Sequence, residues 1–201
     1  MSGLMRVGMA VVLALCVAFT CAAAQAAEVA GVLLADRVRL TDDGPELFLN
    51  GAGLRTKVIF KIYVAGLYLP EKKPTAAEVL ALKGPKRVLL MILRELSAEQ
   101  LVEALHDGLK FNASPDELAR MKPQIAALDS IMLAAKKVDK GNSIAFDYLP
   151  ASGTRITING EVKGAPIPGE DFYKAVLKIW IGEQPVELTL RDAMLGVAPQ
   201  H

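Results

Sequence analysis

The sequence contains few of the residues that build metal centres and nucleophilic sites. Its 201 residues include only two Cys, two His and one Trp. Two His and two Cys are too few for a zinc or iron–sulfur centre, so we expect no metal site and no cofactor. The sequence also lacks the Gly-x-Gly-x-x-Gly, Walker, His-Glu-x-x-His and Gly-x-Ser-x-Gly patterns, so nothing indicates the chemistries that those motifs serve.

An excess of charge of either sign is also absent. The chain has 23 Lys and Arg against 22 Asp and Glu. A protein that binds nucleic acid through its phosphates needs a basic excess to displace counterions, so we expect no nucleic-acid partner. The hydrophobic share of 52% is too high for a disordered chain.

Residues 1–26 have the three parts of a secretory signal peptide. Arg6 is their only charged residue, residues 7–19 are almost wholly apolar, and Ala24-Gln25-Ala26 provides small residues for cleavage after Ala26. Two alternatives are a membrane-spanning anchor, whose apolar core would be short, and a lipoprotein modified at Cys21. We therefore expect a periplasmic or secreted protein with no stable membrane anchor after signal cleavage.

Cleavage would change the composition of the protein. Cys16 and Cys21 would both be removed, so neither a disulfide nor thiol chemistry is expected. The formal net charge falls to zero when Arg6 is lost. Residues 27–201 contain no repeat or flexible linker, and a chain of this length is sufficient for one domain with its own core.

The mature sequence predicts an α+β fold, in which antiparallel strands surround a helical middle and a helix closes the chain. A short apolar run at 47–49 is expected to stop at the glycine-containing residues 50–53. Alternation predicts one long strand over 54–69, and the apolar run within 87–96 predicts a central strand buried on both faces. Further strands are expected at 32–40, 142–149 and 154–159. Helices are expected at 75–82, from 97 to about 109, from 114 to 132 with a bend at Pro123, and at 170–181.

Arg55 and Tyr63 are the strongest candidates for a functional site. They lie on the same face of the predicted strand over 54–69, whose other face is apolar. A guanidinium and a phenol can together hold a carboxylate or an enolate at the mouth of an apolar cleft. Lys57 and Lys61 share this face, and we expect them to be solvated.

Three segments carry a resemblance to a known family. Gly51-Ala52-Gly53-Leu54-Arg55, the run from Tyr63 to Leu69 and the segment 169–182 resemble the chalcone isomerase superfamily, in particular its bacterial chalcone isomerase-like branch. The resemblance spans residues 30–197. It implies a large antiparallel sheet covered on one face by a layer of helices, with a ligand cleft between sheet and helices.

The resemblance implies two kinds of activity. In the enzymes an Arg, matched here by Arg55, stabilises an enolate with help from a Thr, a Tyr and an Asn, but these positions correspond here to Tyr63, Leu101 and approximately Gly108. In the fatty-acid-binding branch, an Arg and a Tyr at positions that resemble Arg55 and Tyr63 hold a carboxylate.

Three hypotheses follow from the sequence. The first is a non-catalytic protein that binds a fatty acid or similar amphiphilic carboxylate through Arg55, Tyr63 and Leu101. The second is an isomerase or lyase of the chalcone isomerase type, in which Arg55 is the catalytic residue. The third is a structural or accessory protein of the cell envelope, in which Arg55 is buried and paired.

Overall fold

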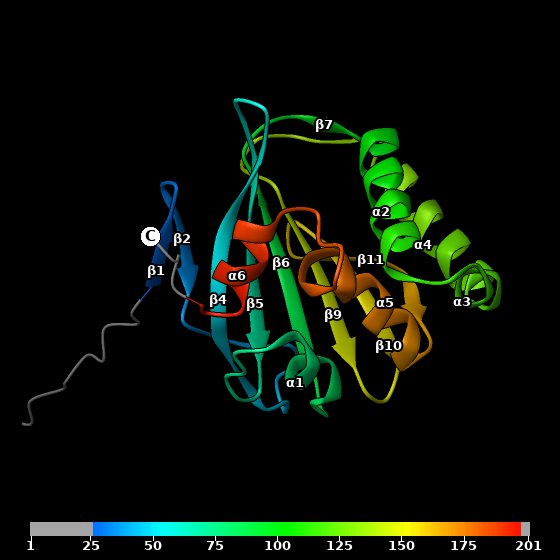
Figure 1. The fold of residues 1–201 in the computed structure, drawn as a ribbon, viewed down its shortest axis with the longest axis horizontal. Coiled ribbons are helices and arrows are strands. Elements are labelled where there is room, and N and C mark those ends of the chain that lie inside the picture. The colour runs from blue at the N-terminus through cyan, green and yellow to red at the C-terminus, as the bar shows by residue number, and fades with distance from the viewer. Residues whose placement is uncertain (1–25, 198–201) are drawn as a thin grey trace, which may run out of the picture.

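The computed structural model describes residues 26–197, so the predicted signal peptide lies outside the described residues apart from Ala26. Its main feature is a seven-stranded antiparallel sheet with the order β11-β10-β9-β6-β5-β4-β3 (Figure 1). The strands are β3 (Arg37–Arg39), β4 (Glu46–Lys57), β5 (Phe60–Leu69), β6 (Lys86–Ile92), β9 (Ser143–Leu149), β10 (Gly153–Ile158) and β11 (Glu161–Ile167). Two smaller sheets pair β1 (Ala26–Val29) with β2 (Val32–Ala35), and β7 (Leu96–Ser97) with β8 (Lys137–Val138).

Helices cover one face of this sheet (Figure 1). They are α1 (Ala76–Ala81), α2 (Ala98–Asn112), α3 (Pro115–Arg120), α4 (Lys122–Ala134), α5 (Glu170–Ile181) and α6 (Leu188–Met194). The main core lies between the two layers, where Phe146 of β9 and Trp180 of α5 pack with their ring centroids 5.5 Å apart. The predicted α+β class, a large antiparallel sheet under a layer of helices, is confirmed.

The opposite face of the sheet carries a second, smaller apolar cluster. Leu34 of β2 packs there with Leu49 and Tyr68 of the sheet. The central strand β6 buries Leu90 on the helix side but leaves Leu89 only partly buried on this face. Strand β6 is therefore buried on the face toward the helices, as predicted, but only partly buried on the opposite face.

A buried ionic group also lies on this opposite face. Asp147 of β9 is fully buried and accepts hydrogen bonds from Arg87 Nε at 2.6 Å and Arg87 Nη2 at 2.8 Å. Arg155 Nη2 donates to the same carboxylate at 2.9 Å. The three residues are direct neighbours across β6, β9 and β10.

Three of the predicted helix starts are confirmed by their caps. Thr75, Ser97 and Ser114 each accept a hydrogen bond from the backbone N–H of the residue three positions on. Such caps satisfy N–H groups that have no partner inside the helix. The helix predicted over 114–132 is instead two helices that meet at Met121, and Pro123 lies in the first turn of the second.

The prediction that the apolar run at 47–49 stops at residues 50–53 is wrong. Strand β4 continues from Glu46 to Lys57 through Gly51 and Gly53, neither of which has a positive φ. The glycines instead allow α6 to lie directly on the strand. A Cβ at Gly51 would overlap the carbonyl oxygen of Ala193, and one at Gly53 would lie 2.8 Å from the Ala193 Cβ.

The single strand predicted over 54–69 is also wrong. The chain reverses at Val58 and Ile59, so β4 and β5 form an antiparallel hairpin. The alternation of apolar residues continues through the turn, and the turn contains no Gly, Pro, Asn or Asp that would mark it in the sequence. Among residues 26–197, no helix is both long and apolar enough to cross a membrane.

Candidate functional site

A cleft of about 600 Å³ lies between the β4–β5 hairpin, helix α2 and the segment that follows α5. Its walls combine apolar side chains such as Ile62 and Val186 with basic ones near the hairpin and the acidic Glu103 and Asp107 of α2. The lining residues are Arg55, Lys57, Ile62, Tyr63, Arg94, Leu96, Gln100, Leu101, Glu103, Ala104, Asp107, Gly108, Phe111, Gln184, Pro185 and Val186. All three residues predicted to bind a ligand, Arg55, Tyr63 and Leu101, lie in this cleft.

The hairpin brings Arg55 and Tyr63 together. Arg55 on β4 and Tyr63 on β5 are direct cross-strand partners. Side chains at such positions leave the same face of the sheet close to one another. The ladder therefore places the guanidinium and the phenol side by side in the cleft, although the sequence prediction had placed both residues on one strand.

Arg55 forms an ion pair that the sequence did not indicate. Its Nη1 donates to Glu187 Oε2 at 2.9 Å and to the carbonyl oxygen of Thr56 at 2.6 Å. Nε and Nη2 of Arg55 take no part in these two hydrogen bonds, and the guanidinium also acts as a hydrogen-bond partner of the Tyr63 hydroxyl. The Nε–Nη2 edge of a guanidinium forms two parallel hydrogen bonds with a carboxylate.

Glu187, the residue just before α6, is held by several donors. The backbone N–H of Thr56 donates to its Oε2 at 2.9 Å, and the Thr56 and Thr189 hydroxyls donate to its Oε1 at 3.2 and 2.9 Å. Partial burial acts to raise the pKa of Glu187, but these hydrogen bonds and that of Arg55 outweigh it, and the net shift is downward. Glu187 is therefore a carboxylate fixed against the guanidinium at the end of the cleft.

Tyr63 receives a hydrogen bond from the only Trp of the chain. Trp180 Nε1 of α5 donates to Tyr63 Oη at 3.0 Å. Burial raises the pKa of Tyr63 to about 12, although the Trp180 hydrogen bond and the Arg55 charge act to lower it. The phenol is therefore protonated at neutral pH, and its proton has no acceptor among residues 26–197.

Helix α2 supplies the opposite wall of the cleft. Leu101 is buried on this helix and presents an aliphatic surface to the cleft. Gly108 allows α2 to approach α5, because a Cβ there would lie 2.6 Å from Cγ2 of Ile179. Neither position offers a side-chain hydrogen-bonding group.

Sequence reasoning missed Glu187, Trp180 and Thr56. Glu187 lies 132 positions from Arg55, and Trp180 lies 117 positions from Tyr63. No local pattern connects residues so far apart. The only available signal was the segment 169–182, which carries part of the family resemblance and contains Trp180.

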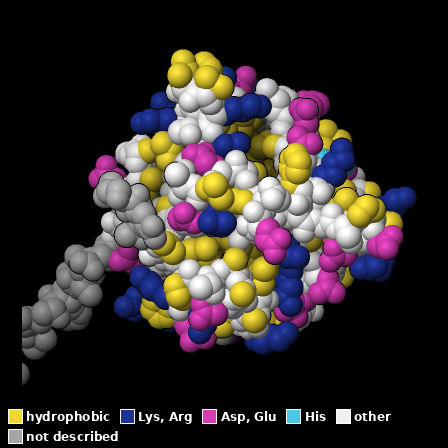
Figure 2. Space-filling model, viewed as in Figure 1, with side chains coloured by type: hydrophobic (Ala, Val, Ile, Leu, Met, Phe, Trp, Pro, Cys, Tyr) yellow, Lys and Arg dark blue, Asp and Glu magenta, His cyan; other side chains and the backbone are white. Residues whose placement is uncertain are grey.

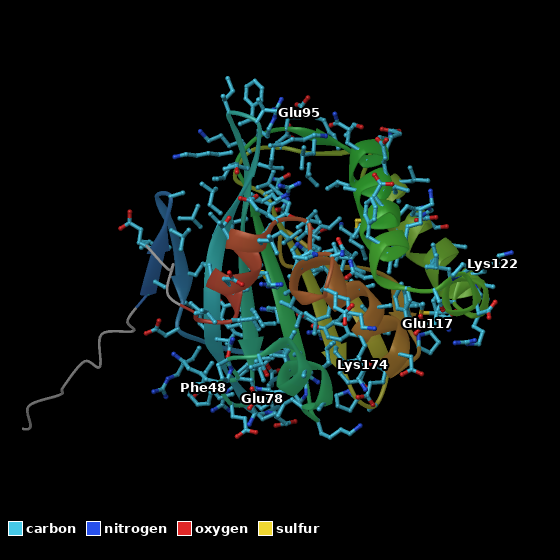
Figure 3. The ribbon with its side chains drawn as sticks, viewed as in Figure 1. Phe48, Glu78, Glu95, Glu117, Lys122 and Lys174 are labelled. Carbon is cyan, nitrogen blue, oxygen red and sulfur yellow. The ribbon has the colours of Figure 1, made fainter. Side chains whose placement is uncertain are left out.

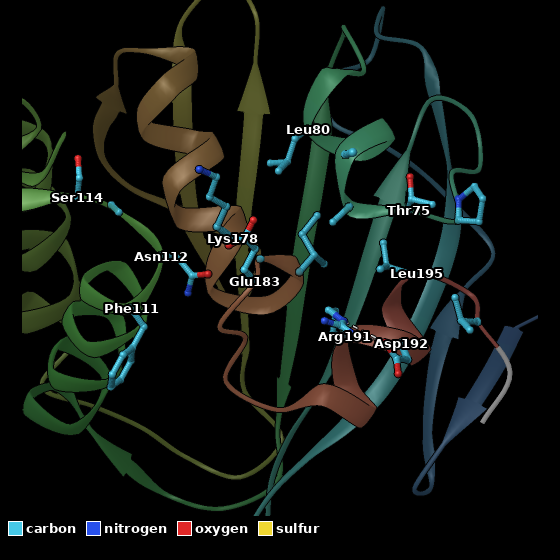
Figure 4. Close-up of a pocket in the computed structure, with 17 residues that line it drawn as sticks. Thr75, Leu80, Phe111, Asn112, Ser114, Lys178, Glu183, Arg191, Asp192 and Leu195 are labelled. Atoms are coloured by element: carbon cyan, nitrogen blue, oxygen red, sulfur yellow. Dashed lines mark hydrogen bonds and ion pairs between the residues drawn. The ribbon is translucent and has the colours of Figure 1, made fainter. Parts of the chain in front are cut away.

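A second cleft, of about 740 Å³, lies between α1, α5 and α6 (Figure 4). Lys178 and Arg191 line it, but Nη2 of Arg191 pairs with the Asp192 carboxylate at 2.9 Å. Phe111 of α2 lines both clefts. None of the residues predicted to bind a ligand lies in this second cleft.

Residues 26–196 match the family model described as chalcone isomerase-like. The chain belongs to the chalcone isomerase-like family, and the resemblance inferred from the sequence is confirmed. Among curated proteins, none matches the chain in sequence. Among solved structures, it is similar to the crystal structure of a fatty-acid binding protein from Arabidopsis thaliana, with a TM-score of 0.63 at 16% identity. The match covers 82% of this chain and 92% of that chain, and at this identity it shows the fold.

Proposed function

We propose that the protein binds a fatty acid, or a similar amphiphilic carboxylate, in the cleft between the β4–β5 hairpin and α2, without catalysis. The observation that carries this proposal is the pairing of Arg55 with Tyr63 at the charged end of a partly apolar cleft. The ion pair with Glu187 leaves Nε and Nη2 of Arg55 out, and the proton of the Tyr63 hydroxyl has no acceptor among the described residues. The structural similarity to the Arabidopsis fatty-acid binding protein supports the same ligand class.

In this proposal the carboxylate of the ligand accepts hydrogen bonds from Nε and Nη2 of Arg55 and from the Tyr63 hydroxyl. Charge-assisted hydrogen bonds of this kind fix the position of a head group. The acyl chain lies against Leu96, Leu101 and Val186. Each methylene that leaves water contributes about 0.8 kcal/mol, so the chain supplies most of the affinity and offsets the cost of association.

The alternative is a chalcone isomerase-type isomerase or lyase, with Arg55 stabilising an enolate. Such a reaction needs polar groups that position the substrate and water around the reacting atoms. Leu101 and Gly108 provide none at the positions that the family resemblance assigns to a Tyr and an Asn. The absence of these groups favours binding over cyclisation.

The test is the dissociation constant for hexadecanoate, measured by calorimetry on protein freed of lipid. We expect Arg55→Ala to weaken binding about tenfold or more, because a charge-assisted contact is lost. Arg37→Ala is the matched control, since it removes an Arg–Glu pair with a 3.1 Å contact to Glu46 outside the cleft. It should leave the affinity unchanged.

Two results would contradict the proposal. If Arg55→Ala lowers the melting temperature but binds hexadecanoate like the unaltered protein, Arg55 is only a paired structural residue. If the unaltered protein instead accelerates the cyclisation of a chalcone and Arg55→Ala does not, the enzymatic alternative holds.

We also propose that the protein is exported and that residues 1–26 are removed. The support is the sequence pattern around Arg6 and Ala24-Gln25-Ala26. When the full chain is expressed in a bacterium, N-terminal sequencing of the periplasmic fraction should begin at Ala27. Intact chain confined to the cytoplasm would contradict export.

A further inference from the structure

The tip of the β4–β5 hairpin is apolar and exposed. Val58, Ile59 and Phe60 are consecutive residues whose exposed fractions are 91%, 83% and 53%. Figure 2 shows hydrophobic side chains at the top of the molecule, where this hairpin projects, with basic side chains beneath them on both sides. Single exposed apolar residues are common on protein surfaces, but three in sequence on a projecting turn require a cause.

The backbone of this turn is strained. Val58 has a φ of +59°, a conformation that is rare for β-branched residues. Two-residue hairpin turns normally use Asn-Gly, Asp-Gly or similar pairs, which tolerate a positive φ at low cost and are also polar. The Val-Ile pair thus disfavours the turn and exposes apolar surface, so neither folding nor solubility explains it. Strain retained at an exposed position points to a functional contact.

Basic side chains surround the apolar tip. Lys57 and Lys61 flank the turn, and the guanidinium carbon of Arg94 lies 4.6 Å from the centroid of the Phe60 ring. Within residues 26–197, none of these three cations takes part in a salt bridge. The nearby Glu95, labelled at the top of Figure 3, pairs with Lys137 at 2.8 Å, which reduces the negative charge beside the tip.

The tip lies beside the mouth of the proposed ligand cleft. Lys57 and Ile62 line that cleft and lie within two residues of the tip along the chain, and Arg94, which also lines the cleft, lies over the Phe60 ring. A ligand that enters between the hairpin and α2 would therefore pass close to Phe60. A surface that positions this end of the protein would also position the entrance of the cleft.

We propose that the hairpin tip inserts into the head-group layer of an anionic lipid bilayer. Val58, Ile59 and Phe60 enter the interface while Lys57, Lys61 and Arg94 contact lipid phosphates, a division of apolar and basic groups that is typical of interfacial anchors. A protein partner is a poorer match, because stable protein interfaces bury about 800 Å² on each side and a two-residue turn is too small and convex. This consequence rests on the proposed function: docking would allow an amphiphilic carboxylate to pass between the bilayer and the cleft.

The test is sedimentation of ligand-free protein with vesicles of phosphatidylcholine, with and without phosphatidylglycerol. The unaltered protein should bind the vesicles that contain phosphatidylglycerol. Val58→Gly/Ile59→Asn puts a glycine at the positive φ and a polar residue after it, the sequence that suits this turn, and should reduce this binding about tenfold or more, with no loss of melting temperature or of hexadecanoate affinity in solution. Lys61→Glu should weaken binding only to the anionic vesicles. Leu33→Asn alters another exposed apolar residue, on the β1–β2 hairpin, and this variant should bind the vesicles like the unaltered protein.

The proposal is overturned if the double variant sediments with anionic vesicles as well as the unaltered protein does. It is also overturned if the unaltered protein ignores vesicles and forms dimers that the double variant abolishes, because the tip is then an interface between copies. If hexadecanoate does not bind in solution but the vesicle results are as expected, membrane docking stands and the proposed ligand class fails.

Discussion

Nη1 of Arg55 lies 2.9 Å from Oε2 of Glu187, so the cation proposed to bind a carboxylate already contacts one from its own chain. Both side chains are about one-fifth to one-quarter exposed. The charge of Arg55 is therefore partly neutralised before any ligand arrives. Glu187 must compete electrostatically with a bound carboxylate for the same guanidinium.

This competition predicts a variant with higher affinity. Glu187→Gln keeps the size of the side chain but removes the negative charge, so hexadecanoate should bind about fivefold to tenfold more tightly. The methyl ester of hexadecanoate should show no gain, because it has no charge. Glu46→Gln, which alters the partner of the exposed Arg37, is the control for a charge change outside the cleft. Calorimetry with both ligands measures the difference, and equal effects on acid and ester would refute the competition.

Tyr63→Phe tests the second head-group ligand. Loss of one hydrogen bond to a charged group should weaken hexadecanoate binding by about 1.5 kcal/mol, or about tenfold. Tyr173→Phe is the control, since Tyr173 is buried beside β9, outside the cleft. Because Trp180 is the only Trp and donates to Tyr63, its fluorescence should change on ligand binding in the unaltered protein. Undiminished affinity in Tyr63→Phe would remove Tyr63 from the site.

Asp147→Ala should cause a large loss of stability. Removal of the fully buried carboxylate leaves Arg87 and Arg155 facing each other without a counter-charge, which costs about 3–5 kcal/mol in the free energy of unfolding. Asp139→Ala removes a half-exposed carboxylate that pairs with Lys137 and should cost less than about 1 kcal/mol. Urea unfolding of both variants measures the difference. Similar losses would show that burial of the group on the second face has little energetic effect.

The buried Lys86 should make the free energy of unfolding depend on pH. Only 2% of this residue is exposed, and burial lowers its pKa from 10.5 to about 8. The unfolded chain therefore binds more protons than the folded one between pH 8 and 10.5, so the Lys86 contribution should make the protein more stable as pH rises through this window. Lys86→Met should raise the free energy of unfolding near pH 7 by about 1–2 kcal/mol and remove that rise. Urea unfolding of both proteins near pH 7 and pH 10 checks the sign, and an identical pH dependence would disprove the assignment to Lys86.

The parts of the fold with local signals could be predicted from the sequence. The caps at Thr75, Ser97 and Ser114 depend on residues three positions apart, and the fold class follows from the order of elements. The β4–β5 hairpin could not be predicted, because Val58 and Ile59 are typical strand residues and the alternation continues through the turn. The turn is visible only in the structure, where the ladder pairs Arg55 with Tyr63.

The candidate site could be predicted only in part, for a similar reason. The sequence names Arg55 and Tyr63 as ligand-binding residues, and the cleft contains both. Their proximity comes from the unpredicted hairpin, because eight positions along one strand would separate them by about 26 Å. Glu187 and Trp180 come from elements that the tertiary fold places beside the hairpin, and no spacing in the sequence indicates these contacts. The charges around Arg55 could therefore not be predicted, because they depend on contacts between residues far apart in the sequence.

Helix α6 runs along β4 in the opposite direction, so that Gly51 faces Ala193, Gly53 faces both Ala193 and Leu190, and Arg55 faces Glu187. The contacts at Gly51 and Gly53 determine how close α6 lies to β4. The contact between Arg55 and Glu187 depends on that distance between helix and strand. A methyl group added at Gly53 would lift the helix and draw the Glu187 carboxylate away from Arg55. Packing on one part of the strand thus tunes the electrostatic potential at another, and changes outside the cleft can alter how strongly the protein prefers an acid over a neutral lipid.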